Sequence, residues 1–251
     1  MSAPRTPALE AVIFDAGGTL VRIDFEWIAA VLVQSGVQTD AATLRRAEVE
    51  GRRRYDASGG SDSGGPLGGP GDIRAYFGGT LMAAGVPPHH IEPAITRLLA
   101  REQASGLWSR AMEGARDAVD AVGRMGLKRA VVSNSDGRAE RHLRNAGVRD
   151  GIDFVVDSHT VGVEKPNPRI FAIALERLET EAAHALYVGD IRSVDEVGAR
   201  AAGLHFVLID PWGDYGAPGA PSIPNMAELP SWIAAHFEVP RPLVAAKPDA
   251  G

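Results

Sequence analysis

The sequence of 251 residues contains no cysteine, which excludes disulfide bonds and thiolate chemistry. A chain without cysteine suits the reducing cytosol, and we expect a cytoplasmic protein. Lysine is almost as scarce, because it occurs only at positions 128, 165 and 247. A lysine that falls within a motif is therefore informative in this chain.

Long apolar runs are also missing. The longest, WIAAVLV from Trp27, is far shorter than the roughly 20 residues of a membrane-spanning helix. The opening MSAPRTPALE has no apolar signal core. Basic residues are not in excess, with 26 against 32 acidic residues and a net charge of −6. Because nucleic acids and anionic membranes attract basic surfaces, we expect no nucleic-acid partner and no membrane partner.

The remaining composition is that of a globular protein, with 45% hydrophobic and 23% charged residues. A chain of this length can bury a full core, either as one large domain or as a domain with an insert. We expect a monomer or a homodimer.

Residues 22–110 predict helices and no strand. Apolar residues recur there at helical spacing, in stretches such as DFEWIAAVLVQSG and PHHIEPAITRLLAREQ, with glycine or proline breaks between them. Residues 58–71 are rich in glycine and lack the Gly-Lys-Ser/Thr ending of a phosphate-binding loop, which favours a flexible linker. The three arginines at 52–54 cannot all face one spot on a helix, so we expect a solvated surface.

Outside this stretch, strands and helices alternate. A short apolar strand pattern covers residues 9–15, and four more follow Ser109: KRAVVSN, DFVVDS, HALYVGD and HFVLID, with helical stretches between them. Alternation of this kind predicts an α/β fold, a Rossmann-like parallel sheet flanked by helices, with the helical stretch as an insert. We place the core at 1–21 and 111–238, the insert at 22–110 and a mobile tail at 239–251.

Polar residues stand at the ends of the predicted strands or in the loops beside them. Since parallel sheets bind ligands at the carboxyl ends of their strands, these residues are expected to meet on one edge. Each one alone has an ordinary explanation as a cap or a solvated side chain. Their common order and placement indicate a site that consists of Asp15, Ser133 with Asn134, Lys165, and Asp190 with Asp195.

These stretches resemble the haloacid dehalogenase superfamily of hydrolases. The matching motifs are FDAGGTL, VVSN, KPNPRIF and VGDIRSVD, in this order between residues 9 and about 210. The helical insert is similar to the α-helical cap that follows the first motif in one subclass of that superfamily. The resemblance implies closure of the cap about two linkers, near residues 21–24 and 108–113.

The resemblance implies a Mg²⁺-dependent phosphatase that acts on a small phosphorylated organic substrate. Asp15 would be the nucleophile, and Lys165 and Ser133 would assist it. Gly18, Thr19, Asn134 and Arg22 would contact the substrate. The metal ligands would be Asp15, the backbone carbonyl of Gly17 and Asp190, with Asp195 at the metal site. Such a site suits the oxygen ligands that Mg²⁺ prefers.

One group of the family pattern is absent. Phosphatases of this superfamily usually carry a second Asp two residues after the nucleophile, where it protonates the leaving oxygen; here that position is Gly17. General acid catalysis contributes about 10²–10⁴-fold in rate. Assuming that the rest of the site is complete, we expect Gly17→Asp to raise phosphatase activity at least tenfold.

Three interpretations of the missing acid stay open. The first is a phosphatase with weakened or rerouted acid catalysis. The second is cleavage on carbon: a metal-independent dehalogenase of halogenated acids, against which the GD of VGDIRSVD argues, or a phosphonate hydrolase, whose cap lysine is missing between residues 22 and 110. The third is a non-catalytic fold that binds a phosphorylated ligand.

Overall fold

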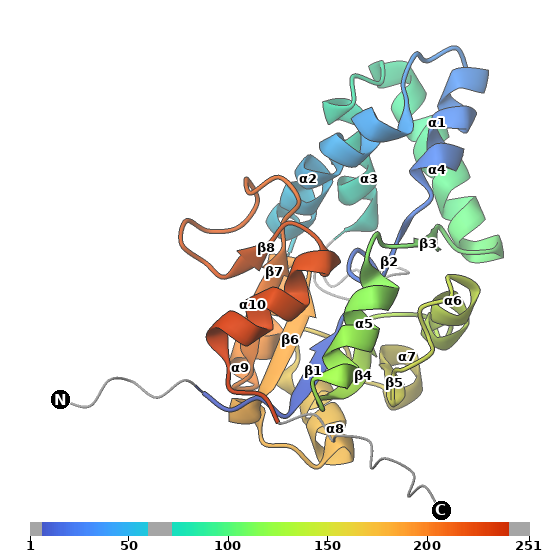
Figure 1. Cartoon of the computed structure of the whole chain (residues 1–251). Helices are drawn as coiled ribbons and strands as arrows, with labels where there is room; N and C mark the ends of the chain where they lie inside the picture. The colour runs from blue at the N-terminus through green and yellow to red at the C-terminus, as the bar shows by residue number, and fades with distance from the viewer. Residues whose placement is uncertain (1–6, 60–71, 241–251) are drawn as a thin grey trace, which may run out of the picture.

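The computed structural model describes residues 7–59 and 72–240, which are built around a six-stranded sheet (Figure 1). The strand order is β5-β4-β1-β6-β7-β8, and every neighbouring pair is parallel. This confirms the predicted α/β class. The strands are β1 (Ala11–Phe14), β4 (Lys128–Ser133), β5 (Phe154–Asp157), β6 (Ala185–Gly189), β7 (His205–Ile209) and β8 (Ser222–Ile223).

The central strand β1 lies at the point where the topology changes direction. From β1 the chain builds β4 and β5 on one side of the sheet and β6, β7 and β8 on the other. In open α/β sheets the crevice at such a point, outside the carboxyl ends of the strands, is where ligands bind. The residues that follow β1, β4 and β6 are therefore placed together by the topology.

Helices cover both faces of the sheet. One layer contains α5 (Ala115–Arg124) and α10 (Leu229–His236), and the other contains α8 (Pro168–Leu178) and α9 (Val197–Ala201). Side chains of β1 alternate between the two layers, so Val12 and Phe14 pack in the first and Ala11 and Ile13 in the second. The short helices α6 (Ala139–Asn145) and α7 (Ser158–Val161) follow β4 and β5.

The insert lies beyond the carboxyl ends of the strands (Figure 1). It contains α1 (Phe25–Gln34), α2 (Ala41–Ala57), α3 (Ile73–Ala83) and α4 (Pro88–Ala104). Three of these helices begin after an aspartate whose carboxylate accepts a hydrogen bond from the first turn: Asp24, Asp40 and Asp72.

The sequence predicted no strand within residues 22–110, and this prediction is wrong at both ends of that stretch. Strands β2 (Val21–Ile23) and β3 (Trp108–Ala111) pair with each other in an antiparallel sheet where the insert leaves and rejoins the core. Strands of three and four residues are too short to show a period of two, and their partners are far apart in sequence. The two linkers that the resemblance implies fall on this small sheet.

Other predicted segments lie partly outside the described residues. The glycine-rich stretch falls mostly within residues 60–71 and the tail mostly within 241–251, neither of which the structure describes. At the start of the tail, Val239 packs against the apolar core. Within the described residues no helix has the length and apolar character that crossing a membrane requires.

Candidate active site

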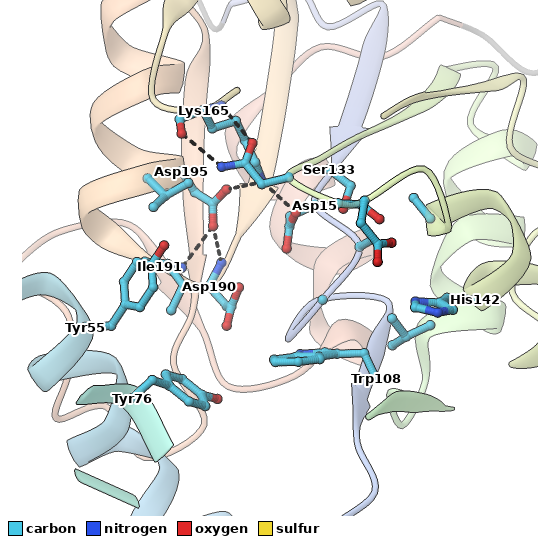
Figure 2. A pocket seen from close by; sticks show the side chains of 18 of the residues that line it. Asp15, Tyr55, Tyr76, Trp108, Ser133, His142, Lys165, Asp190, Ile191 and Asp195 are labelled. Carbon is cyan, nitrogen blue, oxygen red and sulfur yellow. Dashed lines mark hydrogen bonds and ion pairs between the residues drawn. The ribbon is translucent and has the colours of Figure 1, made fainter. Parts of the chain in front are cut away.

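A cavity of about 110 Å³ lies at the carboxyl ends of β1, β4 and β6 (Figure 2). Its volume is several times the ~10–15 Å³ that one water requires. Polar residues of the core line one side of the cavity: Asp15, Ser133, Asn134, Lys165, Asp190 and Asp195. Residues of the insert and of β3 line the other side, among them Tyr55, Tyr76 and Trp108. The topology thus brings together the strand-end residues expected from the sequence.

Asp15 directly continues β1 and is almost completely buried. Its backbone N–H donates to the carbonyl of Val188 on β6 at 2.8 Å, so the main chain still follows the sheet at this residue. The chain then turns sharply through Gly18, whose φ is +78°. A Cβ on Gly18 would lie 2.0 Å from Oδ2 of Asp190, so glycine is required there by conformation and by space.

Lys165 joins the acid cluster from the loop between α7 and α8. Its ammonium donates to Oδ1 of Asp15 at 2.5 Å, to Oδ1 of Asp195 at 2.8 Å and to the hydroxyl of Tyr187 at 2.9 Å. The side chain of Asn134 fixes the lysine backbone, because it accepts from the Lys165 N–H at 2.7 Å and donates to its carbonyl at 2.9 Å. Lys165 is 2% exposed, so its charge is compensated within the protein.

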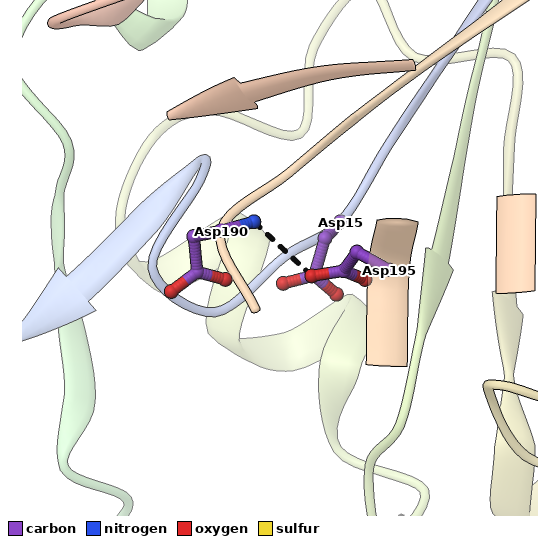
Figure 3. Close-up of side chains that lie close together, drawn as sticks. All are labelled: Asp15, Asp190 and Asp195. Atoms are coloured by element: carbon purple, nitrogen blue, oxygen red, sulfur yellow. Dashed lines mark hydrogen bonds between the residues drawn. The ribbon is translucent and has the colours of Figure 1, made fainter. Parts of the chain in front are cut away.

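Asp195 organises the segment that carries Asp190. Its Oδ2 accepts from the backbone N–H groups of Asp190 at 3.1 Å and Ile191 at 2.9 Å, while its Oδ1 accepts from Lys165. Both carboxylate oxygens are therefore engaged. This arrangement holds Asp190 beside Asp15 across the end of the sheet (Figure 3).

The three acids form a group that fits a hard divalent cation. One oxygen from each of Asp15, Asp190 and Asp195 lies within 4.8 Å of the others. Oδ1 of Asp190 is buried and has no hydrogen-bond partner among the described residues, which is costly unless a further group binds it. All the donors are oxygens, as Mg²⁺ prefers.

Burial also changes the protonation of this group. Removal from water raises the pKa of Asp15 from 3.8 to about 6, although the nearby Lys165 opposes the shift. Burial raises the pKa of Asp190 well above its ordinary value as well. For Lys165 burial disfavours the charged form, but Asp15 and Asp195 outweigh it and raise the pKa of the ammonium. Lysine stays charged, and a bound cation would favour both aspartates in their ionised form.

Arg52 corrects the expectation of a solvated arginine run. Arg52 is 3% exposed, and its guanidinium donates to the carbonyl of Ile209 at 3.0 Å. It also lies 3.5 Å from Oδ2 of Asp190 and 3.6 Å from Glu48. Arg53 and Arg54 are exposed as expected. The signal missed in the sequence is the helical spacing of Arg52 with Glu48, which places both on one face of α2.

Of the remaining predicted residues, Ser133 and Asn134 line the cavity, whereas Gly18, Thr19 and Arg22 do not. The guanidinium of Arg22 pairs instead with Glu26 at 2.9 Å and Glu113 at 3.3 Å. Thr19 is fully buried, and its hydroxyl has no partner among the described residues. In this conformation two carboxylates hold the guanidinium of Arg22, and the roles of Arg22 and Thr19 as substrate contacts stay predictions.

The space beside Gly17 is filled by Trp108. A Cβ built on Gly17 would lie 3.0 Å from Cδ1 and 3.1 Å from Nε1 of the indole, which is tighter than ordinary packing. A side chain at position 17 therefore requires the indole to shift by a few tenths of an ångström, and the expected gain from Gly17→Asp stays a prediction that depends on this shift. Trp108 lies on β3, more than 90 residues after Gly17, and no local pattern in the sequence indicates this contact.

Comparison with known proteins gives the same family over most of the chain. The model of the haloacid dehalogenase-like hydrolases matches residues 9–203. Haloacid dehalogenase-like hydrolase domain-containing protein 3 of Mus musculus is 37% identical over 152 residues, which cover 61% of this chain and 61% of the mouse protein. The matched region thus spans about three fifths of that relative's length.

Two further comparisons concern activity and fold. A ribulose-1,5-bisphosphate 5-phosphatase of Halopiger xanaduensis is 34% identical over 98 residues, 39% of this chain and 41% of that protein. The magnesium-bound structure of YfnB from Bacillus subtilis, a hydrolase of the same type by its description, has a TM-score of 0.56 at 18% identity and covers 90% of this chain and 99% of that one. Solved structures described as phosphatases and as haloacid dehalogenases share the fold at similar identities.

Proposed function

Because this chain belongs to the haloacid dehalogenase-like hydrolases, we propose that it hydrolyses small organic phosphate esters through a phosphoryl group carried on Asp15, with Mg²⁺ as its cofactor. The observation that carries the proposal is the buried group of Asp15, Lys165 and Asp190 at the carboxyl end of the central strand. It combines a nucleophilic oxygen, a positive charge and an unpartnered carboxylate oxygen in one cavity.

The first step is nucleophilic attack on phosphorus. Lys165 binds Oδ1 of Asp15, so Oδ2 is the attacking atom. A bond forms between this oxygen and phosphorus, and the bond from phosphorus to the leaving oxygen breaks with its electron pair. Ser133 and the backbone N–H of Asn134 lie at the end of β4, where they would bind the phosphoryl oxygens. Water then attacks phosphorus, the bond between phosphorus and Oδ2 breaks with its electron pair on the carboxylate, and inorganic phosphate leaves as the water loses a proton to solvent.

The metal site in this proposal uses Asp15, Asp190 and the backbone carbonyl of Gly17. When bound, Mg²⁺ neutralises charge on the phosphoryl oxygens, which lets an anionic carboxylate approach them. We assign Asp195 a positioning role, because its two oxygens hold Lys165 and the backbone of residues 190 and 191. Asp195 would thereby orient the ligands without binding the metal itself.

The charge of the cavity favours this reaction over metal-independent dehalogenation. The three neighbouring carboxylates repel one another unless cations compensate them, and Lys165 with Arg52 supplies two positive charges. A further cation completes the compensation, whereas an anionic haloacid alone would add to the negative charge. The phosphatase-named relative supports the same choice.

The test is phosphate release from phenyl phosphate with and without Mg²⁺. The full chain is compared with Asp15→Asn and with the matched control Asp117→Asn, which alters an exposed aspartate on α5. We expect Mg²⁺-dependent turnover in the wild type and the control, and none in Asp15→Asn. Acid quenching during turnover followed by mass spectrometry is expected to find one phosphoryl group on Asp15.

Two outcomes would overturn the proposal. Chloride release from 2-chloropropionate without metal, in the absence of phosphatase activity, would assign the protein to carbon–halogen cleavage. Silence in both assays, together with Mg²⁺ or phosphate binding measured by calorimetry, would instead indicate a fold that binds a phosphorylated ligand without turning it over.

A further inference from the structure

This inference rests on the proposed function. We propose that Trp108 is a specificity-determining residue: its indole lies in the space beside Gly17 that an acid would need, and it confines efficient turnover to aryl phosphates. In such esters the leaving group is planar and departs as a stable anion. Two properties of the cavity carry the inference: the indole lies 3.0–3.1 Å from the point where a side chain at position 17 would begin, and the surface next to it is aromatic.

The position of Trp108 makes a carboxylate at position 17 costly, because the indole would have to shift to admit it. The pyrrole edge of the indole, Cδ1 and Nε1, faces Gly17 at 3.0–3.1 Å from a built Cβ. The ring contacts Phe77, with the two ring centroids 6.2 Å apart, and Trp108 pairs with Ile23 of β2 in the small sheet. Trp108 is 9% exposed. It is therefore a fixed wall of the cavity rather than a surface side chain.

The acids elsewhere in the cavity lining are already engaged. Glu102 accepts from the backbone N–H of Leu107 at 2.5 Å and pairs with Arg138 at 3.1 Å. Asp136 pairs with the same guanidinium at 2.6 Å. His142 also lines the cavity, with Nε2 buried and unpartnered among the described residues. Burial lowers the pKa of His142, so its ring is neutral near pH 7.

With no carboxylic acid in place to protonate it, the leaving group must carry the electron pair of the broken bond by itself. Phosphorus bonds to Oδ2 of Asp15, the ester P–O bond breaks, and the leaving oxygen departs as an anion that takes a proton from water afterwards. A phenol ionises near pKa 10, whereas alcohols and water ionise near 16. The anion of a phenol is thus the easier leaving group, and alkyl esters lose the ~10²–10⁴-fold that acid catalysis supplies.

The wall opposite Lys165 has the chemistry to bind such a ring. Trp108 and Tyr76 lie on the side of the cavity away from Lys165, and Tyr55 completes the aromatic surface (Figure 2). The hydroxyl of Tyr76 donates to Glu48 at 2.5 Å, which fixes the ring. Aromatic side chains prefer to contact planar rings in stacked or edge-to-face arrangements. Leaving-group stability and ring recognition therefore select the same class of substrate.

The experiment measures kcat/KM for substituted phenyl phosphates and for glycerol 2-phosphate in the presence of Mg²⁺. We expect a steep fall of the rate with rising pKa of the leaving group, and a preference for phenyl over glycerol phosphate of about 10²-fold or more. Trp108→Leu is expected to lower kcat/KM for phenyl phosphate about tenfold, with little change for glycerol 2-phosphate. Trp212→Leu, at an exposed tryptophan, is the matched control and is expected to leave both unchanged.

Three outcomes would overturn the inference. Comparable Asp15-dependent rates for aryl and alkyl esters would refute it and leave the proposed phosphatase intact, whereas no Asp15-dependent phosphate release from any ester would refute both. A steeper leaving-group dependence in His142→Gln would make His142 the acid. Trp108→Phe, checked for folding by circular dichroism, keeps a ring in place and is expected to retain more of the aryl preference than Trp108→Leu.

Discussion

Lys165 and Arg52 are both buried beside the acid cluster, but they come from different parts of the molecule. Lys165 belongs to the core and is held by two carboxylates and a tyrosine hydroxyl. Arg52 reaches the same cluster from α2 of the insert, and its closest hydrogen bond is to the backbone carbonyl of Ile209. The core thus supplies the positive charge next to the nucleophile Asp15. The insert supplies a second positive charge, on Arg52, which forms an ion pair with Asp190 of the core.

The two cations also differ in what holds each of them at the site. The core cation lies among side chains that a rigid parallel sheet positions, so its surroundings depend little on the insert. The insert cation exists at the site only while α2 is docked on the core. Further contacts hold that docking, because Asp56 of α2 accepts from the backbone N–H of Ser193 at 3.1 Å and from the hydroxyl of Tyr215 at 2.7 Å.

Removal of the core cation should have the largest effect. In Lys165→Met the carboxylates of Asp15 and Asp195 lose their shared partner inside the protein. Breaking a buried ion pair by removing one partner costs about 3–5 kcal/mol, and we expect a fall of this size in the free energy of unfolding measured with urea. Lys128→Met, at an exposed lysine on β4, is the control. A loss below that of the control would mean that the cluster is not ionised.

Removal of the insert cation should cost less. Arg52→Met loses a hydrogen bond to a backbone carbonyl and an ion pair with Asp190 at 3.5 Å, for which we expect a loss of about 2 kcal/mol in the free energy of unfolding. The neighbouring Arg54→Met, which removes an exposed pair with Glu50, should cost well under 1 kcal/mol. If both variants lost the same free energy of unfolding, the buried Arg52 would contribute no more to stability than the exposed Arg54.

The contact between Gly17 and Trp108 joins the two parts and gives a smaller effect. Gly17→Asp is expected to lower the free energy of unfolding by about 1–2 kcal/mol, because the new Cβ overpacks against the indole. The tenfold gain in activity expected from the sequence depends on a shift of the indole. The double variant Gly17→Asp/Trp108→Ala should lose less stability than the sum of the single variants, and a purely additive result would show that the two positions do not interact.

The smallest expected effect is on pH dependence. Burial raises the pKa of Asp15 from 3.8 to about 6, so between these values the folded metal-free protein holds a proton that the unfolded chain has lost. This contribution to stability is present at low pH and is lost as the pH rises through about 6.

Relative to Asp15→Asn, the free energy of unfolding of the wild type should therefore fall by about 1 kcal/mol between about pH 5 and about pH 7. The measurement is urea unfolding of both proteins with a chelator present. Addition of Mg²⁺ is expected to reduce the difference, since a bound cation favours ionised Asp15. If the free energy of unfolding of the wild type instead rose with pH relative to Asp15→Asn, burial would not raise the pKa of Asp15.

The sequence by itself determined the parallel α/β class, five of the six strands of the sheet and most residues of its reactive edge; the two-residue strand β8 was missed. Strand patterns at 9–15 and after Ser109, with helices between them, predicted a parallel sheet, and the carboxyl ends of parallel strands lie on the same edge. Asp15, Ser133, Lys165 and Asp190 were therefore found without coordinates, because each stands beside a strong local signal. The roles of these residues in binding metal and phosphate stay predictions.

Only the tertiary structure decided what faces that edge. Trp108 meets Gly17 through the pairing of two strands too short to recognise, and Arg52 meets Asp190 through the docking of a helix that looks solvated in sequence. Local propensity and periodicity report on neighbours along the chain. The contacts of Trp108 and Arg52 instead depend on packing between segments more than 90 residues apart, which no local pattern encodes.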